Sequence, residues 1–171
     1  MPRVATSGPA SRRVQYFTAP VRNLTSARHR QDTYLQALQT QCQSLEIVEG
    51  RFQAKTCTCR FCLATWTTYE EKESDVSLAV SLVEDAALDL YDMALVMSAD
   101  SDLCPAVRAV RRVRPGTRIV AVFPPRRHSD ELARQVDGVV WLGRDKLHRS
   151  QLPAKVVTAN GIELVRPLYW R

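Results

Sequence analysis

The chain has 171 residues, a formal net charge of +6, 45% apolar residues and five cysteines. This length suits one domain with one sizeable core, and no apolar run approaches the roughly 18 residues of a membrane span. The opening stretch MPRVATSGPASRR lacks the hydrophobic centre of a secretory signal. An odd number of cysteines without such a signal favours reduced thiols and a cytoplasmic location over a disulfide framework.

Charge is distributed unevenly along the chain. Residues 1–30 carry six Arg and no acidic residue, whereas residues 70–102 carry ten acidic residues and one Lys. Residues 103–171 carry fourteen basic and five acidic residues. An acidic patch with basic flanks suits a metal site that acts on a polyanion such as RNA. Because 20 of the 24 basic residues are Arg, the base composition of the gene is an alternative explanation.

Helical and strand patterns alternate along the chain. Strands are expected where apolar residues alternate or run uninterrupted between turn residues, and helices where they recur at three- and four-residue spacing. In chain order the expected elements are a strand over 13–19, a helix over 30–40, a strand over 45–52, a helix over 74–92, a strand over 93–98, a helix over 102–113, a strand over 118–125, a helix over 128–136 and a strand over 138–143. Residues 53–68 show no clear period.

Local signals refine these elements. Ser74 or Asp75 is a natural N-cap for the longest helix, because its side-chain oxygen can accept from a free backbone N–H. Pro105 is tolerated in the first turn of the next helix, and Asn160-Gly161 predicts a hairpin turn near the C-terminus. The alternation predicts an open α/β sheet, mostly parallel, with helices on both faces.

Three carboxylates are expected at one edge of this sheet. Asp100 and Asp102 directly follow an apolar strand, and sites in open parallel sheets form outside the carboxyl ends of the strands. Asp75 begins the preceding helix. Clustered carboxylates repel each other unless a proton or a cation intervenes, and Mg²⁺ or Mn²⁺ prefers such oxygen ligands. The alternative interpretation is that an Asp at this place only caps the following helix.

A second enzyme class also uses Asp-x-Asp after an apolar strand. In haloacid-dehalogenase-type phosphatases the first Asp of the pair is a nucleophile. That motif normally follows the first strand of the domain, whereas Asp100 and Asp102 follow the third strand expected here. A phosphatase with an Asp nucleophile is therefore the less favoured hypothesis.

Three cysteines cluster in the stretch KTCTCRFC. Cys57, Cys59 and Cys62 include a C-x-x-C pair, which is often half of a structural zinc site. A closed site needs a fourth ligand, for which the candidates are Cys42, His29, His128 and His148. Reduced cysteines in a loop, or a redox-sensitive pair, are the alternatives. Cys104 is expected to be a small buried apolar residue.

Basic residues follow two of the later strands. Arg126 and Arg127, in FPPRRHS, leave a strand end beside the expected acidic site and could hold phosphates. Lys146 and Arg149, in DKLHRS, are further candidates for contact with a nucleic-acid backbone. A solvated loop is the alternative for both stretches. Trp141 lies in an apolar run and is expected in the core.

Several motifs, in this order and spacing, together resemble the NYN-domain group of PIN-like nucleases. They are EEKESDV, SADSDL, FPPRRHS and DKLHRSQLP, with RQDTYLQAL and EGRF upstream. The resemblance covers about residues 14–171. It implies a Rossmann-like (PIN-like) three-layer α/β/α sandwich and a hydrolase activity, the metal-dependent cleavage of RNA.

The resemblance also implies roles for particular residues. The acidic positions of the family fall on Asp75, Asp100 and Asp102, which would hold Mg²⁺ or Mn²⁺ and act in catalysis. Glu71 and Lys72 belong to the same EEK-x-x-D motif. Ser98 and Ser101 match small polar residues around the aspartates and are expected to position them.

One feature of the family is missing. Its members normally open with a central strand that ends in Asp, followed by Gly and Asn, and residues 1–13 contain nothing similar. The expected organisation is a disordered leader over 1–13, an N-terminally incomplete NYN domain over 14–157 and a hairpin tail over 158–171. An impaired nuclease, or a catalytically weak module that binds RNA or a protein, follows from this departure. A partner strand or an oligomer could fill the gap in the sheet.

Overall fold

The computed structural model describes residues 13–21, 25–167 and 170. Contacts divide the chain into two compact units, residues 1–49 with 152–171, and residues 50–151. The predicted leader lies outside the described residues except for Arg13. Among the helices of the described residues, none is both long and apolar enough to cross a membrane.

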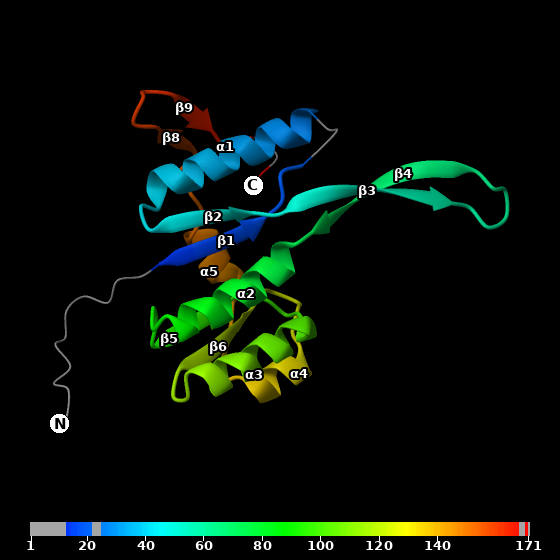
Figure 1. The fold of residues 1–171 in the computed structure, drawn as a ribbon. Helices are drawn as coiled ribbons and strands as arrows, with labels where there is room; N and C mark the ends of the chain where they lie inside the picture. The colour runs from blue at the N-terminus through cyan, green and yellow to red at the C-terminus, as the bar shows by residue number, and fades with distance from the viewer. Residues whose placement is uncertain (1–12, 22–24, 168–169, 171) are drawn as a thin grey trace. The chain divides into compact units, whose positions relative to one another are not determined.

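The first unit contains a parallel strand pair joined by a helix (Figure 1). Strand β1 (Val14–Thr18) pairs in parallel with β2 (Leu45–Glu49), and α1 (Thr25–Gln41) connects them. The strand and the helix predicted here are confirmed, and α1 extends beyond the predicted range at both ends. Tyr34 of α1 packs edge-on against Tyr16 of β1 at 6.4 Å between ring centroids.

The predicted turn at Asn160-Gly161 is confirmed. Strands β8 (Lys155–Val157) and β9 (Glu163–Val165) form an antiparallel hairpin around it. Gly161 has φ 79°, a left-handed value that glycine adopts without steric cost. The hairpin therefore begins at Lys155 rather than after residue 157.

The second unit begins with an antiparallel hairpin that the sequence did not reveal. Strand β3 (Arg51–Thr58) pairs with β4 (Thr65–Lys72) along their full length. The hairpin lacks the apolar alternation of a half-buried strand, because most of its side chains are exposed on both faces. Its Thr content, a residue type enriched in strands, was the available signal.

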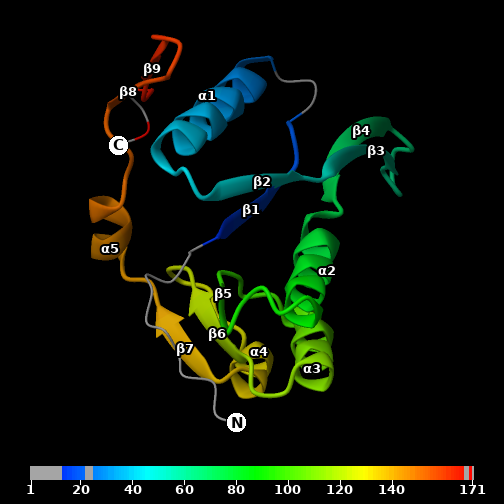
Figure 2. The same ribbon diagram turned by 60° about the vertical axis from the view of Figure 1, so that its left-hand side comes forward.

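The rest of the second unit follows the predicted alternation. Three parallel strands form a sheet in the order β5-β6-β7, namely β5 (Met93–Val96), β6 (Arg118–Phe123) and β7 (Gly138–Trp141). The helices are α2 (Ser74–Ala87), the 3₁₀ turn η1 (Ser101–Leu103), α3 (Cys104–Val113), α4 (Asp130–Gln135) and α5 (Arg144–Arg149). Figure 2 shows α2, α3 and α4 together on one side of this sheet.

The core of the second unit lies between the sheet and these helices. Val107 and Val110 of α3 and Ile119 and Phe123 of β6 are almost completely buried. The predicted burial of Cys104 is confirmed, since it belongs to the same cluster. Burial of such side chains contributes roughly 1.5–3 kcal/mol each, so this packing fixes the position of the strand ends.

Strand β5 has an open edge and exposed apolar side chains. Met93 and Leu95 of β5, and Met97 directly after it, are exposed, and among the described residues no strand pairs with the outer edge of β5. The fold is thus of the mixed α/β class, with parallel and antiparallel sheets. The described strands form four separate sheets, so the three-layer sandwich, with or without its first central strand, stays a prediction.

Candidate functional site

The loop that leaves β5 holds Asp100 in a defined conformation. The backbone N–H of Asp100 donates to Ser98 Oγ at 3.1 Å, and Asp100 Oδ1 accepts from the backbone N–H of Asp102 at 2.9 Å. Asp100 is therefore the N-cap of η1, with extended backbone angles. The cap fixes the carboxylate of Asp100, while Asp102 in the same turn remains exposed. Ser98 accepts one of these bonds, and its role in positioning the aspartates for a ligand stays a prediction.

Asp75 lies in the first turn of α2, but the predicted N-cap is wrong. Glu73 occupies the cap position with φ 78° and makes no side-chain capping bond. Ser74 is already helical, and its hydroxyl donates to Glu71 Oε1. Ser74 is therefore inside the helix rather than at its cap position, and its hydroxyl links the first turn of α2 to Glu71.

The structure brings the carboxylates of two separate motifs near each other. Partial burial raises the pKa of the Asp75 carboxyl, and the negative charges of Asp100, Glu71 and Asp102 raise this pKa further. A carboxyl group whose pKa is raised by burial and by neighbouring negative charges is characteristic of functional sites. EEK-x-x-D and SADSD thus contribute to one acidic cluster, defined here as Asp75, Asp100, Asp102 and Glu71.

The donor set of the acidic cluster fits a hard divalent cation. Carboxylate oxygens are the preferred ligands of Mg²⁺ and Mn²⁺, and a cation would relieve the repulsion within the cluster. Within residues 13–21, 25–167 and 170, however, no three His, Cys, Asp or Glu side chains are arranged closely enough to hold a metal ion. The oxygen ligands and negative charge of the cluster suit such a cation, but its described side chains are not close enough together to form a ligand shell.

The other charged residues of the EEK motif have structural partners. Lys72 lies 3.2 Å from Glu70 Oε2, and Lys55 of the facing strand pairs with the same carboxylate. Arg51 pairs with Glu73 at the junction of β4 and α2. Glu71, rather than Lys72, therefore joins the acidic cluster, while these ion pairs hold the strand that leads to Asp75.

Gly50 is a residue of this site that sequence reasoning missed. A Cβ atom at Gly50 would lie 2.6 Å from the backbone O of Lys72 and 2.9 Å from Ser74 Oγ. A backbone carbonyl cannot move aside cheaply, so only glycine fits next to the end of β4 and the start of α2 without displacing the segment before Asp75. The sequence EGRF contains this glycine but gives no sign of its close neighbour.

Arg126 and Arg127 lie in a tight turn directly after β6. The backbone N–H of Arg127 donates to the O of Pro124 at 3.2 Å, which closes the turn. Arg126 has φ 64°, a left-handed value usually taken by Gly or Asn at the third position of a type II turn. Both side chains are exposed. The turn holds two cationic side chains at the same end of the sheet as Asp100.

Lys146 and Arg149 lie on α5, which begins three residues after β7. Both are exposed, and Arg149 Nε donates to the O of Asp145 in its own helix. Together with Arg126 and Arg127 they form a group of basic residues that follows the carboxyl ends of β6 and β7. Their contact with RNA stays a prediction.

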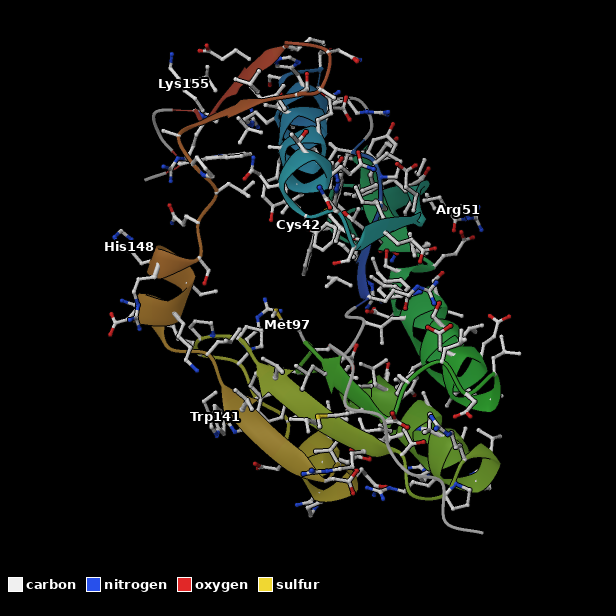
Figure 3. The ribbon with its side chains drawn as sticks, turned by 90° about the vertical axis from the view of Figure 1, so that its left-hand side faces the viewer. Cys42, Arg51, Met97, Trp141, His148 and Lys155 are labelled. Atoms are coloured by element: carbon white, nitrogen blue, oxygen red, sulfur yellow. The ribbon has the colours of Figure 1, made fainter. Side chains whose placement is uncertain are left out.

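Trp141 is not a core residue, contrary to the sequence-based prediction. It is the last residue of β7, an edge strand of the sheet, and 61% of its surface is exposed (Figure 3). Its indole packs against Phe123 at 5.1 Å between ring centroids, and against His128 at 5.9 Å. The apolar run correctly predicted a strand, but not that its last side chain lies on an open edge.

The three clustered cysteines lie on the β3–β4 hairpin. Cys57 is in β3, and Cys59 and Cys62 are in the turn, where Cys59 N–H donates to the O of Ala64 at 2.8 Å. Hydrogen bonds from the backbone N–H groups of Cys62 and Phe61, and from the Cys62 thiol, lower the pKa of Cys59. Zinc binding by these thiols stays a prediction, and the lowered pKa favours the thiolate form of Cys59.

Comparison with known proteins identifies the family. The NYN domain matches residues 3–143, so the chain belongs to the NYN-domain family of the PIN-like superfamily. No curated protein matches the chain. A solved structure of a protein of unknown function from Vibrio parahaemolyticus is similar over 82% of this chain and 98% of its own, with 16% identity and a TM-score of 0.39.

Proposed function

We propose that the protein is a metal-dependent endoribonuclease that hydrolyses phosphodiester bonds in RNA. Asp75, Asp100 and Asp102 would be its catalytic carboxylates, and Mg²⁺ or Mn²⁺ its cofactor. The observation that supports this proposal is the environment of Asp75. Partial burial and the negative charges of Asp100, Glu71 and Asp102, which come from two separate motifs, raise the pKa of the Asp75 carboxyl. Membership of a nuclease-type family supports the same conclusion.

The residues in and around the acidic cluster would have different roles in such a reaction. Asp75, Asp100 and Asp102 would hold the cation, while Ser98 fixes the backbone of Asp100. When bound, the cation would polarise a phosphoryl oxygen and lower the pKa of a water molecule. Arg126 and Arg127 would neutralise the phosphates of the RNA, since planar guanidinium groups suit phosphate oxygens.

A second function is favoured by one observation. Because no described group of side chains is arranged to hold a metal ion, the chain could bind RNA without turnover. The exposed apolar side chains of β5 fit this alternative, and so does its outer edge, with which none of the described strands pairs, since a partner segment there would complete the sheet. Such a protein would bind RNA in a salt-sensitive manner through its basic residues.

Cleavage of a single-stranded RNA oligonucleotide by the purified full chain separates the two functions. A nuclease gives products with Mn²⁺ or Mg²⁺, none with EDTA, and none in the Asp100→Asn variant. A binding module gives salt-sensitive retention of intact RNA under all three conditions. Robust cleavage that persists in EDTA or in Asp100→Asn would show that the acidic cluster is not the catalytic centre.

A further inference from the structure

The second unit has three further exposed features outside the acidic cluster. They are the outer edge of β5, the cysteine-containing hairpin turn, and Trp141 with its neighbours. Trp141 combines a large exposed surface with defined ring contacts, and it ends a strand at the same end of the sheet as Asp100.

Trp141 leaves a large part of its apolar surface exposed. Tryptophan buries more apolar surface than any other side chain when it is covered, yet Trp141 keeps 61% of its surface exposed. Its neighbour Phe123 is 1% exposed, so the indole covers the end of the core with one part and leaves the remainder open. The contact at 5.1 Å with an interplanar angle of 61° holds the ring in a defined orientation.

The turn after β6 brings an imidazole against Trp141 and carries two Arg residues. The imidazole of His128 is 5.9 Å from the indole at 51°, and lies 3.7 Å from Asp130. Arg126 and Arg127 precede His128 in the same turn, and both are exposed. Exposed aromatic rings with flanking Arg residues are the combination by which proteins bind unpaired bases and the adjacent phosphates.

Strand direction places these groups at one end of the sheet. Strands β5, β6 and β7 are parallel, with Phe123 opposite Trp141 in register. Asp100 follows β5, Arg126 follows β6 and Trp141 ends β7, so all three lie at carboxyl ends of adjacent strands. RNA that reaches the acidic cluster can therefore extend along this edge toward Trp141.

We propose that Trp141 is a stacking site for an unpaired RNA base, with His128 beside the ring and Arg126 and Arg127 on the adjacent phosphates. This inference rests on the proposed function for the identity of the ligand. Single-stranded RNA is the expected ligand because the bases of a duplex are already stacked on each other and are not free to reach an indole. Trp141, at the end of β7, would therefore make the protein prefer single-stranded over double-stranded RNA.

Binding of a fluorescently labelled single-stranded RNA in EDTA tests this proposal without cleavage. Trp141→Leu keeps an apolar side chain over Phe123 but removes the aromatic face, and should weaken binding about tenfold, the order expected for one stacked base. Trp141→Phe keeps an aromatic face and should bind within about threefold of the wild type. Trp66→Leu, which alters another half-exposed indole on the hairpin, is the matched control and should leave binding unchanged.

A second readout does not require changing Trp141. In a Trp66→Phe, Trp170→Phe variant, Trp141 is the single tryptophan. With excitation selective for tryptophan, the single-stranded RNA should quench its emission while a blunt duplex of the same length should not. Unquenched emission together with wild-type affinity in Trp141→Leu would overturn the stacking site and leave the indole to a protein partner. Failure of cleavage with Mn²⁺, by contrast, would affect the proposed nuclease and not this result.

Discussion

The carboxyl groups at the two ends of the β5-β6-β7 sheet have pKa values shifted in opposite directions. At the amino ends of the strands, Asp137 Oδ2 accepts from the backbone N–H of Ile119 at 2.8 Å and its Oδ1 lies 3.0 Å from Arg111. These bonds lower the pKa of Asp137. At the carboxyl ends, partial burial and the negative charges of Asp100, Glu71 and Asp102 raise the pKa of Asp75.

The contrast separates what stabilises the fold from what serves a function. A carboxylate with satisfied hydrogen bonds holds β6, β7 and α3 together, whereas carboxylates that repel each other cost stability. Such a cost is expected where a ligand will later supply the compensating charge. Under the proposed function, the carboxyl ends of the strands are the functional end of this unit.

The largest expected effect is the loss of cleavage when the functional end is altered. Asp102→Asn should reduce the rate of RNA cleavage at least about 100-fold, because it removes a charge that would stabilise the cation and the transition state. Glu84→Gln, an exposed carboxylate farther along α2, is the matched control and should retain full activity. Equal rates in the two variants would refute the role of Asp102.

The next largest effect concerns the structural end. Asp137→Ala leaves the buried N–H of Ile119 without its acceptor, and should lower the free energy of unfolding by about 1–3 kcal/mol. Because the pKa of Asp137 is lowered in the folded state, this stabilisation is present above the unfolded pKa of about 4. It is lost as the pH falls through the folded pKa.

Urea unfolding of the wild type and Asp137→Ala at neutral and acidic pH measures this difference. The two proteins should differ at pH 7 and converge as the pH is lowered below the folded pKa of Asp137. A difference in unfolding free energy that stays constant with pH would mean that the carboxylate is not the stabilising group.

The acidic site and the Asp137 network differ in how far the sequence could predict them. The motifs around Asp75 and Asp100 predicted one acidic site, and the alternating periods predicted every strand and helix from β5 to β7 because burial imposes those periods. The importance of Asp137 could not be predicted, because its partners Ile119 and Arg111 lie 18 and 26 residues away. Long-range pairing leaves no local signal.

Other misses have equally specific causes. The β3–β4 hairpin carries no periodic apolar pattern because most of its side chains are exposed on both faces. The exposure of Trp141 depends on β7 being an edge strand, which an apolar run does not encode. The restriction at Gly50 depends on the carbonyl of Lys72, 22 residues away.

Gly50→Ala should reduce the rate of RNA cleavage less than the loss of a catalytic carboxylate does. The added Cβ displaces the segment that positions Asp75, so RNA cleavage should fall about tenfold while the Asp137 network is untouched. Gly143→Ala, whose Cβ would meet nothing within 4 Å, is the matched control. Hydrogen exchange of the α2 amides should increase in Gly50→Ala alone if the displacement is real.

Removal of charge from the functional end should raise stability slightly. Asp75→Asn in the presence of EDTA removes repulsion from Asp100, Glu71 and Asp102, and should raise the melting temperature by about 1 °C, a small effect because the side chain is solvent-screened. Differential scanning fluorimetry at pH 7 measures the change. A lower melting temperature would indicate that Asp75 is a structural residue like Asp137.

The smallest effect is a difference in thiol reactivity. Cys59, whose pKa is lowered by hydrogen bonds, should react with iodoacetamide before Cys104, whose pKa is raised by burial and by Glu131. Mass spectrometry of the briefly labelled folded protein measures the order. Preferential labelling of Cys104 would contradict the core packing described for α3.

Paramagnetic broadening by Mn²⁺ is the most direct test of the contrast between the two ends of the sheet. Substoichiometric Mn²⁺, added to isotope-labelled protein, should broaden the amide resonances of Asp75, Asp100 and Asp102 before any others, and should leave that of Asp137 sharp. Broadening that begins at Asp137 or at the cysteine-containing hairpin, or that spreads evenly over all acidic residues, would contradict a cation site at the functional end.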